Sequence, residues 1–320
     1  MTEKVNENKC QEVNIKHTEE IIRWHIGNKV RHDVVKKMDY RAHVEKEEFL
    51  RKSLKGINFI DIHREAISRG ERYRHILDTI IQMLNIPDSS ICADLGAGTA
   101  TFAALISLQP KVQKVYAVEI SEQFTKHIMP ITFDYFKVPK EKIVRIVGDF
   151  NSLEFEDNSL DFTVETGSFH HSEDIAITLS ECYRVLRPGG FLLAVERARF
   201  NTISESKKKI ILNKELSTEM KKKYGILDGE SYTLEMWGEH EYTFYEWNRH
   251  LKAAGFLTKM VVVNPFALFL PVLRWICSVG SSGFEPFYIK NQTCFIKNPR
   301  IYYELLSVPI FICIKPYTKM

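Results

Sequence analysis

Short apolar runs alternate with amphipathic stretches through the middle of the chain, and this alternation predicts its secondary structure. Helices between the strands require crossover connections, which make the sheet mainly parallel and place helices on both faces. The predicted fold class is therefore α/β, with a doubly wound sheet of seven strands. The predicted strands lie at residues 91–95, 114–119, 142–147, 160–165, 191–196, 256–263 and 308–314.

Helical periodicity outside these strands divides the chain into regions. Residues 1–64 combine a polar tail with short amphipathic helices over about 19–54, which form an N-terminal helical extension. The main domain, 65–320, begins with a helix over 65–84 whose apolar positions recur every three to four residues and need a sheet to cover them. Two insertions interrupt this domain: a charged, helical cap at about 197–240 and a long insertion at about 264–307.

The charge balance argues against a nucleic-acid partner. The chain has 44 Lys and Arg residues against 41 Asp and Glu residues, and the formal net charge of +3 is too small for a nucleic-acid footprint. We interpret the lysine runs at 207–209 and 221–223 as solvated helix faces rather than phosphate-binding sites.

Cysteine usage and hydropathy indicate a cytoplasmic protein. The six cysteines are scattered and include no C-x-x-C pair, which is typical of free thiols in a reducing compartment. Residues 1–16 lack the apolar middle region of a secretion signal. The most apolar stretch, 261–277, is interrupted by prolines, an asparagine and an arginine and is shorter than the roughly 20 residues of a membrane span. No transmembrane segment is expected.

The loop after the first predicted strand carries the first candidate chemistry, because ligands of open α/β sheets bind beyond the carboxyl ends of the strands. Gly96 and Gly98 would let the backbone turn tightly and approach a ligand, although a tight turn alone would use the same residues. Thr101 replaces the third glycine of a dinucleotide fingerprint. Asp94 precedes the loop, where an anionic side chain suits a cation better than a pyrophosphate.

Acidic residues also end or follow the next two strands. Glu119 ends the second strand, where its carboxylate can accept hydrogen bonds from both hydroxyls of a ribose. Taken alone, Glu119 leaves a nicotinamide dinucleotide and an adenosyl cofactor both open. Asp149 and Phe150 follow the third strand, and such a pair can bind the amino group of adenine and cover its ring.

In their order along the chain, these motifs resemble those of class I S-adenosylmethionine-dependent methyltransferases, in particular the small-molecule group that includes the quinone-ring methyltransferases. The resemblance covers roughly 91–263 and leaves out 1–64 and the insertion after 263. It rests on DLGAGT at 94–99, VE at 118–119, GDF at 148–150, FEDNSLDF at 155–162, FHH at 169–171, RVLRPGG at 184–190, GEHEYT at 238–243 and AAGF at 253–256.

The resemblance implies S-adenosyl-L-methionine as the cofactor and suggests which residues bind it. By analogy with the family, each part of the cofactor has its own residues: Asp94 near the methionine amine, Gly96 and Gly98 along the methionine portion, Glu119 at the ribose, Asp149 and Phe150 at the adenine, and Thr166 as a further contact with the amino-acid end. Thr99 and Ile120 are also predicted to bind the cofactor.

Histidines are the candidate general bases, since an oxygen or activated-carbon nucleophile loses a proton near neutral pH. His170 and His171 follow the fourth predicted strand, and His240 opens the segment after the cap. We prefer His171 or His240 as the base, although each histidine could instead hydrogen-bond and shape its loop. No metal is expected to take part.

Motifs that are missing favour a small-molecule acceptor. The fourth predicted strand is followed by TGSF at 166–169 rather than by Asn/Asp-Pro-Pro-Tyr, which disfavours an amino group on a nucleic-acid base, and no Pro-Cys pair is there for pyrimidine chemistry. The apolar stretch 264–280 is open to three interpretations: core or homo-oligomer interface, wall of an apolar substrate site, or membrane-surface contact.

The sequence thus predicts an enzyme that transfers a methyl group from S-adenosylmethionine to an oxygen, nitrogen or carbon atom of a small organic acceptor. Two alternatives stay open. One is a non-catalytic protein that binds an adenosyl cofactor. The other is a nicotinamide-dependent oxidoreductase, which the missing third glycine disfavours.

Overall fold

The structure is a computed structural model. It describes residues 21–27, 30–53, 74, 77–78, 81–82, 84–199, 201–227, 229–261, 286–287 and 310–317.

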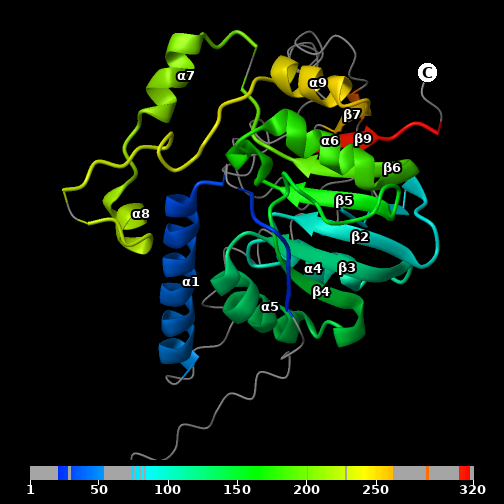
Figure 1. The fold of residues 1–320 in the computed structure, drawn as a ribbon, viewed down its shortest axis with the longest axis horizontal. Coiled ribbons are helices and arrows are strands. Elements are labelled where there is room, and N and C mark those ends of the chain that lie inside the picture. Colours follow the sequence, from blue (N-terminus) through cyan, green and yellow to red (C-terminus); the bar gives the residue numbers. More distant parts are fainter. Residues whose placement is uncertain are drawn as a thin grey trace, which may run out of the picture.

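One nine-stranded sheet organises the described residues (Figure 1). The strand order is β1-β4-β3-β2-β5-β6-β9-β7-β8, and pairing is parallel except where β9 pairs with β6 and β7. The predicted doubly wound, mainly parallel α/β fold is confirmed. The strands are β1 Ile21–Arg23, β2 Ser90–Leu95, β3 Val112–Glu119, β4 Ile143–Val147, β5 Leu160–Thr166, β6 Leu186–Val195, β7 Leu257–Val261, β8 Pro286–Phe287 and β9 Ile310–Ile314.

The sheet differs from the prediction in its strand count, because nine strands replace the expected seven. All seven predicted strands are present, and β1 and β8 are added at the two edges. β1 pairs in parallel with β4, with Ile21 opposite Arg145, and β8 pairs with β7. These two strands have three and two residues, so a hydrophobic period cannot reveal them.

Helices cover both faces of the sheet and one of its ends (Figure 1). The carboxyl ends of the parallel strands point toward α1, α7 and α8, at the left of the view. The helices are α1 His32–Ser53, α4 Thr101–Ser107, α5 Met129–Phe136, α6 Ile175–Val185, α7 Glu205–Leu212, α8 Thr218–Lys223 and α9 Phe244–Ala253, with a π-helical turn at Phe124–Ile128 and 3-10 turns at Lys140–Lys142 and Phe169–His171.

α1 corrects the prediction of several short helices over 19–54. It is one helix of 22 residues that contains neither proline nor glycine, so nothing within it breaks the hydrogen-bond ladder. Arg41 of α1 donates to the hydroxyl of Tyr224 at 3.1 Å and lies over the Phe124 ring. α1 therefore connects the segment after β3 with the segment that carries α7 and α8.

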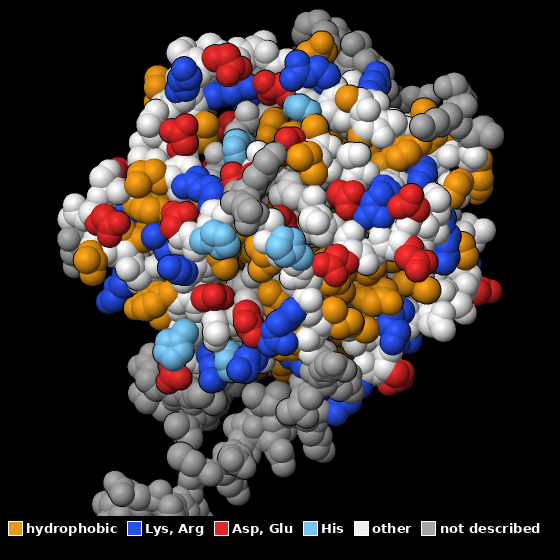
Figure 2. Space-filling model, viewed as in Figure 1, with side chains coloured by type: hydrophobic (Ala, Val, Ile, Leu, Met, Phe, Trp, Pro, Cys, Tyr) orange, Lys and Arg blue, Asp and Glu red, His pale blue; other side chains and the backbone are white. Residues whose placement is uncertain are grey.

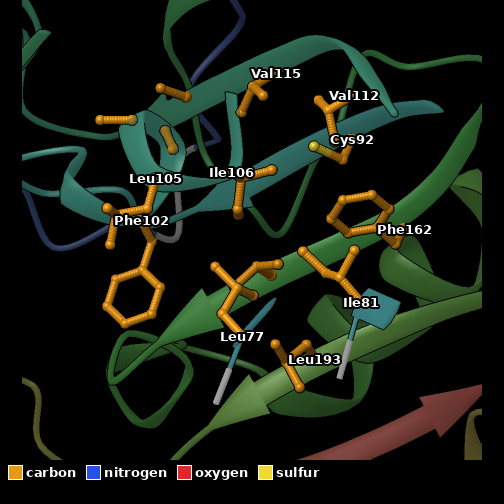
Figure 3. Close-up of a cluster of buried hydrophobic side chains, with 14 of the residues drawn as sticks. Leu77, Ile81, Cys92, Phe102, Leu105, Ile106, Val112, Val115, Phe162 and Leu193 are labelled. Carbon is orange, nitrogen blue, oxygen red and sulfur yellow. The ribbon is translucent and has the colours of Figure 1, made fainter. Parts of the chain in front are cut away.

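Two apolar layers hold the sheet, one on each face. Successive residues of β6 point to opposite sides, so Leu193 joins the cluster beside α4, while Leu192 joins the cluster beside α6 and α9. Figure 3 shows the first cluster, in which Leu77 lies toward Phe102 of α4 and Ile81 lies toward Phe162 of β5. Burial on both faces explains why the central strands are continuous apolar runs.

Parts of the remaining predictions lie outside the described residues. Of the helix predicted over 65–84, the described residues are helical. Only Pro286–Phe287 of the insertion at 264–307 is described, so the three interpretations of 264–280 fall outside the structure. Within the described part of the chain, no helix is both long and apolar enough to cross a membrane. Figure 2 shows basic and acidic side chains interspersed over one face, in keeping with the small net charge.

Candidate functional site

Asp94 lies on β2, one residue before the glycine loop, and is 1% exposed. Its Oδ2 atom accepts a hydrogen bond from the backbone N–H of Ala103 at 2.9 Å. Its Oδ1 atom has no hydrogen-bond partner among the described residues. Burial raises the pKa of Asp94 to about 7, the Ala103 N–H opposes that rise, and the charge of Glu119 adds to it. A cationic group near Oδ1 would relieve the desolvation of this carboxylate.

Replacing Asp94 with Asn is expected to remove a pH dependence of stability. Because the pKa rises from its ordinary value of 3.8 to about 7 on folding, the folded protein binds a proton that the unfolded chain has released between these pH values. The free energy of unfolding should therefore fall as pH rises from about 4 to about 7 and level off above it. At roughly 1.4 kcal/mol per pKa unit, the upper limit is about 4 kcal/mol.

Urea unfolding of the wild type and Asp94→Asn between pH 4 and pH 8 tests this expectation. As pH rises through that window, the free energy of unfolding of the wild type should fall relative to that of Asp94→Asn. A difference that stays constant over the whole range would contradict the raised pKa.

The two glycines of the loop have different surroundings. Both have positive φ values, +71° at Gly96 and +53° at Gly98. A Cβ atom on Gly96 would lie 2.4 Å from the Cβ of Ser168, so this glycine lets the β2 and β5 loops meet. A Cβ atom on Gly98 would have no atom of the described structure within 4 Å. Gly96 therefore serves packing, whereas Gly98 borders open space. Thr99 beside it is half-buried, and its hydroxyl is 3.0 Å from that of Thr101.

Glu119, at the end of β3, is bound to the glycine loop. Its Oε2 atom accepts from the N–H of Gly98 at 2.8 Å, and Oε1 accepts from the N–H of Ser121 at 3.0 Å. Burial raises the pKa of Glu119, and the backbone N–H groups act against that rise. The Ser121 hydroxyl donates to Asp39 of α1 at 2.5 Å, and Ile120 is half-buried between these residues. The structure thus brings Asp94, Gly98 and Glu119 to one rim of the sheet.

Asp149 and Phe150 occupy the next loop along this rim. The Oδ1 atom of Asp149 accepts from the backbone N–H of Asn151 at 2.8 Å and from its side-chain amide at 3.0 Å. The Phe150 ring meets Phe169 edge-on, with centroids 5.4 Å apart, and lies 3.6 Å from the position of a Cβ on Gly96. These predicted residues therefore adjoin the glycine loop.

The end of β5 holds a buried carboxyl group that the sequence reasoning missed. Glu165 is fully buried, and its Oε2 atom accepts from the N–H of Ser168 at 3.1 Å and from its hydroxyl at 3.2 Å. Burial and the adjacent charge of Glu196 raise its pKa well above the ordinary value. Thr166, the predicted contact, follows Glu165 and pairs with Val195 of β6 in the sheet register.

His170 lies between two carboxyl groups. Its Nδ1 atom is 2.8 Å from Oε2 of Glu196, and its backbone N–H donates to Oε1 of the same side chain at 3.0 Å. Its Nε2 atom is 3.5 Å from Oε2 of Glu239, an oxygen that also accepts from Arg197. Burial acts to lower the pKa of His170, but the two carboxylates outweigh it and the net shift is upward.

The three predicted histidines meet in this network. The His171 ring lies beside His170 with centroids 4.3 Å apart, and burial together with the neighbouring histidine lowers the pKa of His171 to about 3. The Nδ1 atom and the backbone N–H of His240 lie 2.9 Å and 3.0 Å from the carbonyl oxygen of His170. A carbonyl only accepts, so Nδ1 of His240 carries the hydrogen and Nε2 of the neutral ring has the lone pair.

Sequence reasoning missed the charged partners of these histidines. A signal was available, because the fourth and fifth predicted strands both end in glutamate, as LDFTVE and FLLAVE. The ligand atoms of His170, His171 and Glu239 lie within 4.8 Å of one another, so these three could hold a metal ion. The expectation that no metal takes part stays a prediction.

Comparisons with known proteins agree with this geometry. Residues 93–194 match the family model described as a methyltransferase domain. The chain is 29% identical over 120 residues to malonyl-[acyl-carrier protein] O-methyltransferase of Methylococcus capsulatus, which covers 38% of this chain and 40% of that protein. It is also 28% identical to demethylmenaquinone methyltransferase of Staphylococcus saprophyticus over 135 residues. This aligned region is 41% of this chain and 55% of that protein. The chain thus spans about half or less of the length of these relatives.

A solved structure is similar at a lower level. The S-adenosyl-L-methionine complex of phosphoethanolamine N-methyltransferase 2 from Haemonchus contortus is 17% identical, with a TM-score of 0.47, over 76% of this chain and 53% of that chain. This similarity is too weak to add to the argument. The matched region nevertheless contains β2 to β6 and their loops, which are the elements that carry the predicted motifs. Residues 93–194 are therefore similar to a methyltransferase domain, in agreement with the predicted resemblance to the class I S-adenosylmethionine-dependent methyltransferases.

Proposed function

We propose that the chain transfers a methyl group from S-adenosylmethionine to an oxygen, nitrogen or carbon atom of a small organic acceptor. The observation that carries the proposal is the buried Oδ1 atom of Asp94, which has no hydrogen-bond partner among the described residues and lies just before the loop that opens at Gly98. A buried carboxylate oxygen of this kind suits a ligand with a positively charged amine.

The residues at the rim fit the parts of this cofactor. We assign the methionine amine to Asp94, with Gly98 and Thr99 beside the methionine chain. We assign the ribose hydroxyls to Glu119, whose two oxygens accept from backbone N–H groups in the described structure, and place Ile120 against the same part. Gly96 contributes by letting the loop pass Ser168. The remaining assignments are the adenine to Asp149 and Phe150, and the carboxylate end of the methionine to Thr166.

When bound, the cofactor supplies an electrophilic methyl group on a positively charged sulfur. The chain orients the acceptor toward that methyl group and excludes water from it, and such positioning is worth roughly 7 to 11 kcal/mol in favourable cases. We propose that residues 197–240 form the cap that does this. Support comes from Arg31 of the N-terminal segment, whose guanidinium donates to the backbone oxygens of Glu235 and Met236 at 2.9 Å and 2.5 Å. The cap is thereby joined to α1, across the carboxyl ends of the strands.

His240 is the preferred proton acceptor for a nucleophile that must lose a proton. Its Nδ1 hydrogen bond to the His170 carbonyl leaves Nε2 as the accepting atom. His171 is the second candidate, but its low pKa makes it a weak base near neutral pH. The Nδ1 atom of His170 is hydrogen-bonded to Glu196, so His170 acts as a positioning residue in this scheme. We expect the enzyme to work in the cytoplasm.

Calorimetric titration of the full chain with S-adenosylmethionine, S-adenosylhomocysteine and NAD tests the proposal. We expect saturable binding of the two adenosyl ligands and none of NAD. Binding of NAD alone would favour the oxidoreductase alternative. Binding without methyl transfer to any member of a broad acceptor panel, assayed with a labelled methyl group, would favour the non-catalytic alternative.

A further inference from the structure

His170, His171 and Glu239 form a group of potential metal ligands beside the proposed acceptor site. The three residues come from the turn after β5 and from the end of the 201–239 segment, so the fold and not the local sequence brings them together. Two neutral imidazoles and one carboxylate are a ligand set that divalent transition metals use in proteins, often with coordination positions left open.

The distances between these side-chain atoms suit a shared metal ion better than direct hydrogen bonds between the side chains. The Nε2 atom of His170 is 3.5 Å from Oε2 of Glu239, the oxygen that Arg197 also binds, and Nε2 of His171 is 4.0 Å from Oε1 of Glu239. Both distances exceed the 2.7–3.2 Å that is usual for a hydrogen bond. Ligands at about 2.1 Å from a tetrahedral ion lie about 3.4 Å apart. The three ligand atoms lie within 4.8 Å of one another, so a change of about 1.4 Å in the largest of these distances would close the set around an ion.

An outer contact holds the His170 ring in an orientation that suits a metal. Nδ1 of His170 lies 2.8 Å from Glu196, so this hydrogen bond places the hydrogen on Nδ1 and the lone pair of a neutral ring on Nε2, toward Glu239. A carboxylate or backbone partner on the second ring nitrogen is the usual companion of a metal-bound histidine.

The charges around the group also leave a place for a cation. Glu196 and Glu239 contribute two carboxylates, and Arg197 contributes one guanidinium, which binds Oε2 of Glu239. That contact leaves Oε1 of Glu239 directed to His171. The His171 side chain is 33% exposed, so an ion and a further ligand can reach it from outside.

We propose that His170, His171 and Glu239 bind a divalent transition-metal ion, and that Glu196 is a positioning residue that orients His170. This departs from the expectation that no metal takes part. Metal binding occupies the lone pair of His171, so it excludes His171 as the general base and leaves His240 for that role. The proposal does not depend on methyl transfer, because its test measures binding of the ion.

The full chain is treated with a chelator and then titrated with Co²⁺. Binding is monitored by the visible d–d absorption of the bound ion, and Zn²⁺ is then added to displace Co²⁺. We expect one saturable equivalent per chain. His171→Ala and Glu239→Gln should each weaken Co²⁺ binding at least about 100-fold, and Glu196→Gln should weaken it about 10- to 100-fold. His127→Ala, which changes a partly buried histidine of the π-helical turn, is the matched control and should bind as the wild type does.

Circular dichroism and thermal unfolding confirm that each variant folds. His170→Ala is left out because its ring is buried in the network and its loss could unfold the loop. Absence of a visible Co²⁺ band in the folded wild type would overturn the proposal. So would equal affinity in wild type, His171→Ala and Glu239→Gln, because the ion would then be bound at other histidines of the chain.

Discussion

Glu119→Ala should weaken binding of S-adenosylmethionine by about 100-fold. In the proposed complex this carboxylate accepts from both ribose hydroxyls, and hydrogen bonds to a charged group contribute about 1.5–3 kcal/mol each. Loss of about 3 kcal/mol corresponds to a change in Kd on the order of 100-fold. The free energy of unfolding should change less, because the substitution removes the desolvation of a buried carboxylate together with its hydrogen bonds to Gly98 and Ser121.

Calorimetry with S-adenosylmethionine and S-adenosylhomocysteine measures the effect on affinity, and urea unfolding measures the effect on stability. Glu122→Ala is the matched control, because it removes a carboxylate three residues away that is 43% exposed and paired with Arg23. It should leave cofactor affinity unchanged. If Glu119→Ala unfolds the protein instead, the carboxylate is structural, and unchanged affinity in a folded variant would remove the ribose assignment.

Substitution by alanine should lower the free energy of unfolding much more at Gly96 than at Gly98. Gly96→Ala is expected to lower the free energy of unfolding by about 3 kcal/mol, since the new Cβ would lie 2.4 Å from Ser168 and the backbone keeps a φ of +71°. Gly98→Ala also has a positive φ, but its Cβ would meet no described atom within 4 Å. It should cost only about 1 kcal/mol of stability.

Comparison of these two variants distinguishes a glycine that is needed for packing from one that is needed for ligand binding. The Gly98→Ala methyl group would enter the space that we assign to the methionine chain of the cofactor, so affinity should fall while the fold persists. Urea unfolding and calorimetry on both variants provide the comparison. Equal destabilisation by the two substitutions would show that Gly98 is also a packing residue, and full affinity in Gly98→Ala would move the cofactor away from this loop.

The sequence predicted the central strands well because burial on both faces produces short apolar runs rich in β-branched residues, whose length and flanking glycines and prolines distinguish them from buried helices. It also predicted Asp94, Glu119 and Asp149 at one rim, because parallel strands bring their carboxyl ends to the same edge. The structure agrees with that placement: Glu119 accepts from Gly98, and Phe150 lies beside Gly96. These relations follow from strand order alone.

The histidine network could not be predicted in the same way. The contact of His170 with Glu196 spans 26 residues, and its contact with His240 spans 70 residues. The first contact depends on how the turn after β5 packs against the end of β6, and the second on how that turn meets the chain at His240; no periodicity encodes either one. α1 was divided into short helices for a related reason, since a helix with a weak apolar stripe gains its stability from tertiary contacts such as that of Arg41 with Tyr224.

β1 changes which strand forms the edge of the sheet. Without it, β4 would be the outermost strand of a twisted parallel sheet, with free backbone N–H and C=O groups along Ile143–Val147. Such an exposed edge can recruit strands from other molecules. β1 pairs with that edge, and the backbone N–H of Trp24 extends the pairing to Val147 at 2.9 Å while the Trp24 ring packs on Gly148. The outermost strand is thus three residues long instead of five, which shortens the edge that the sheet offers to another molecule.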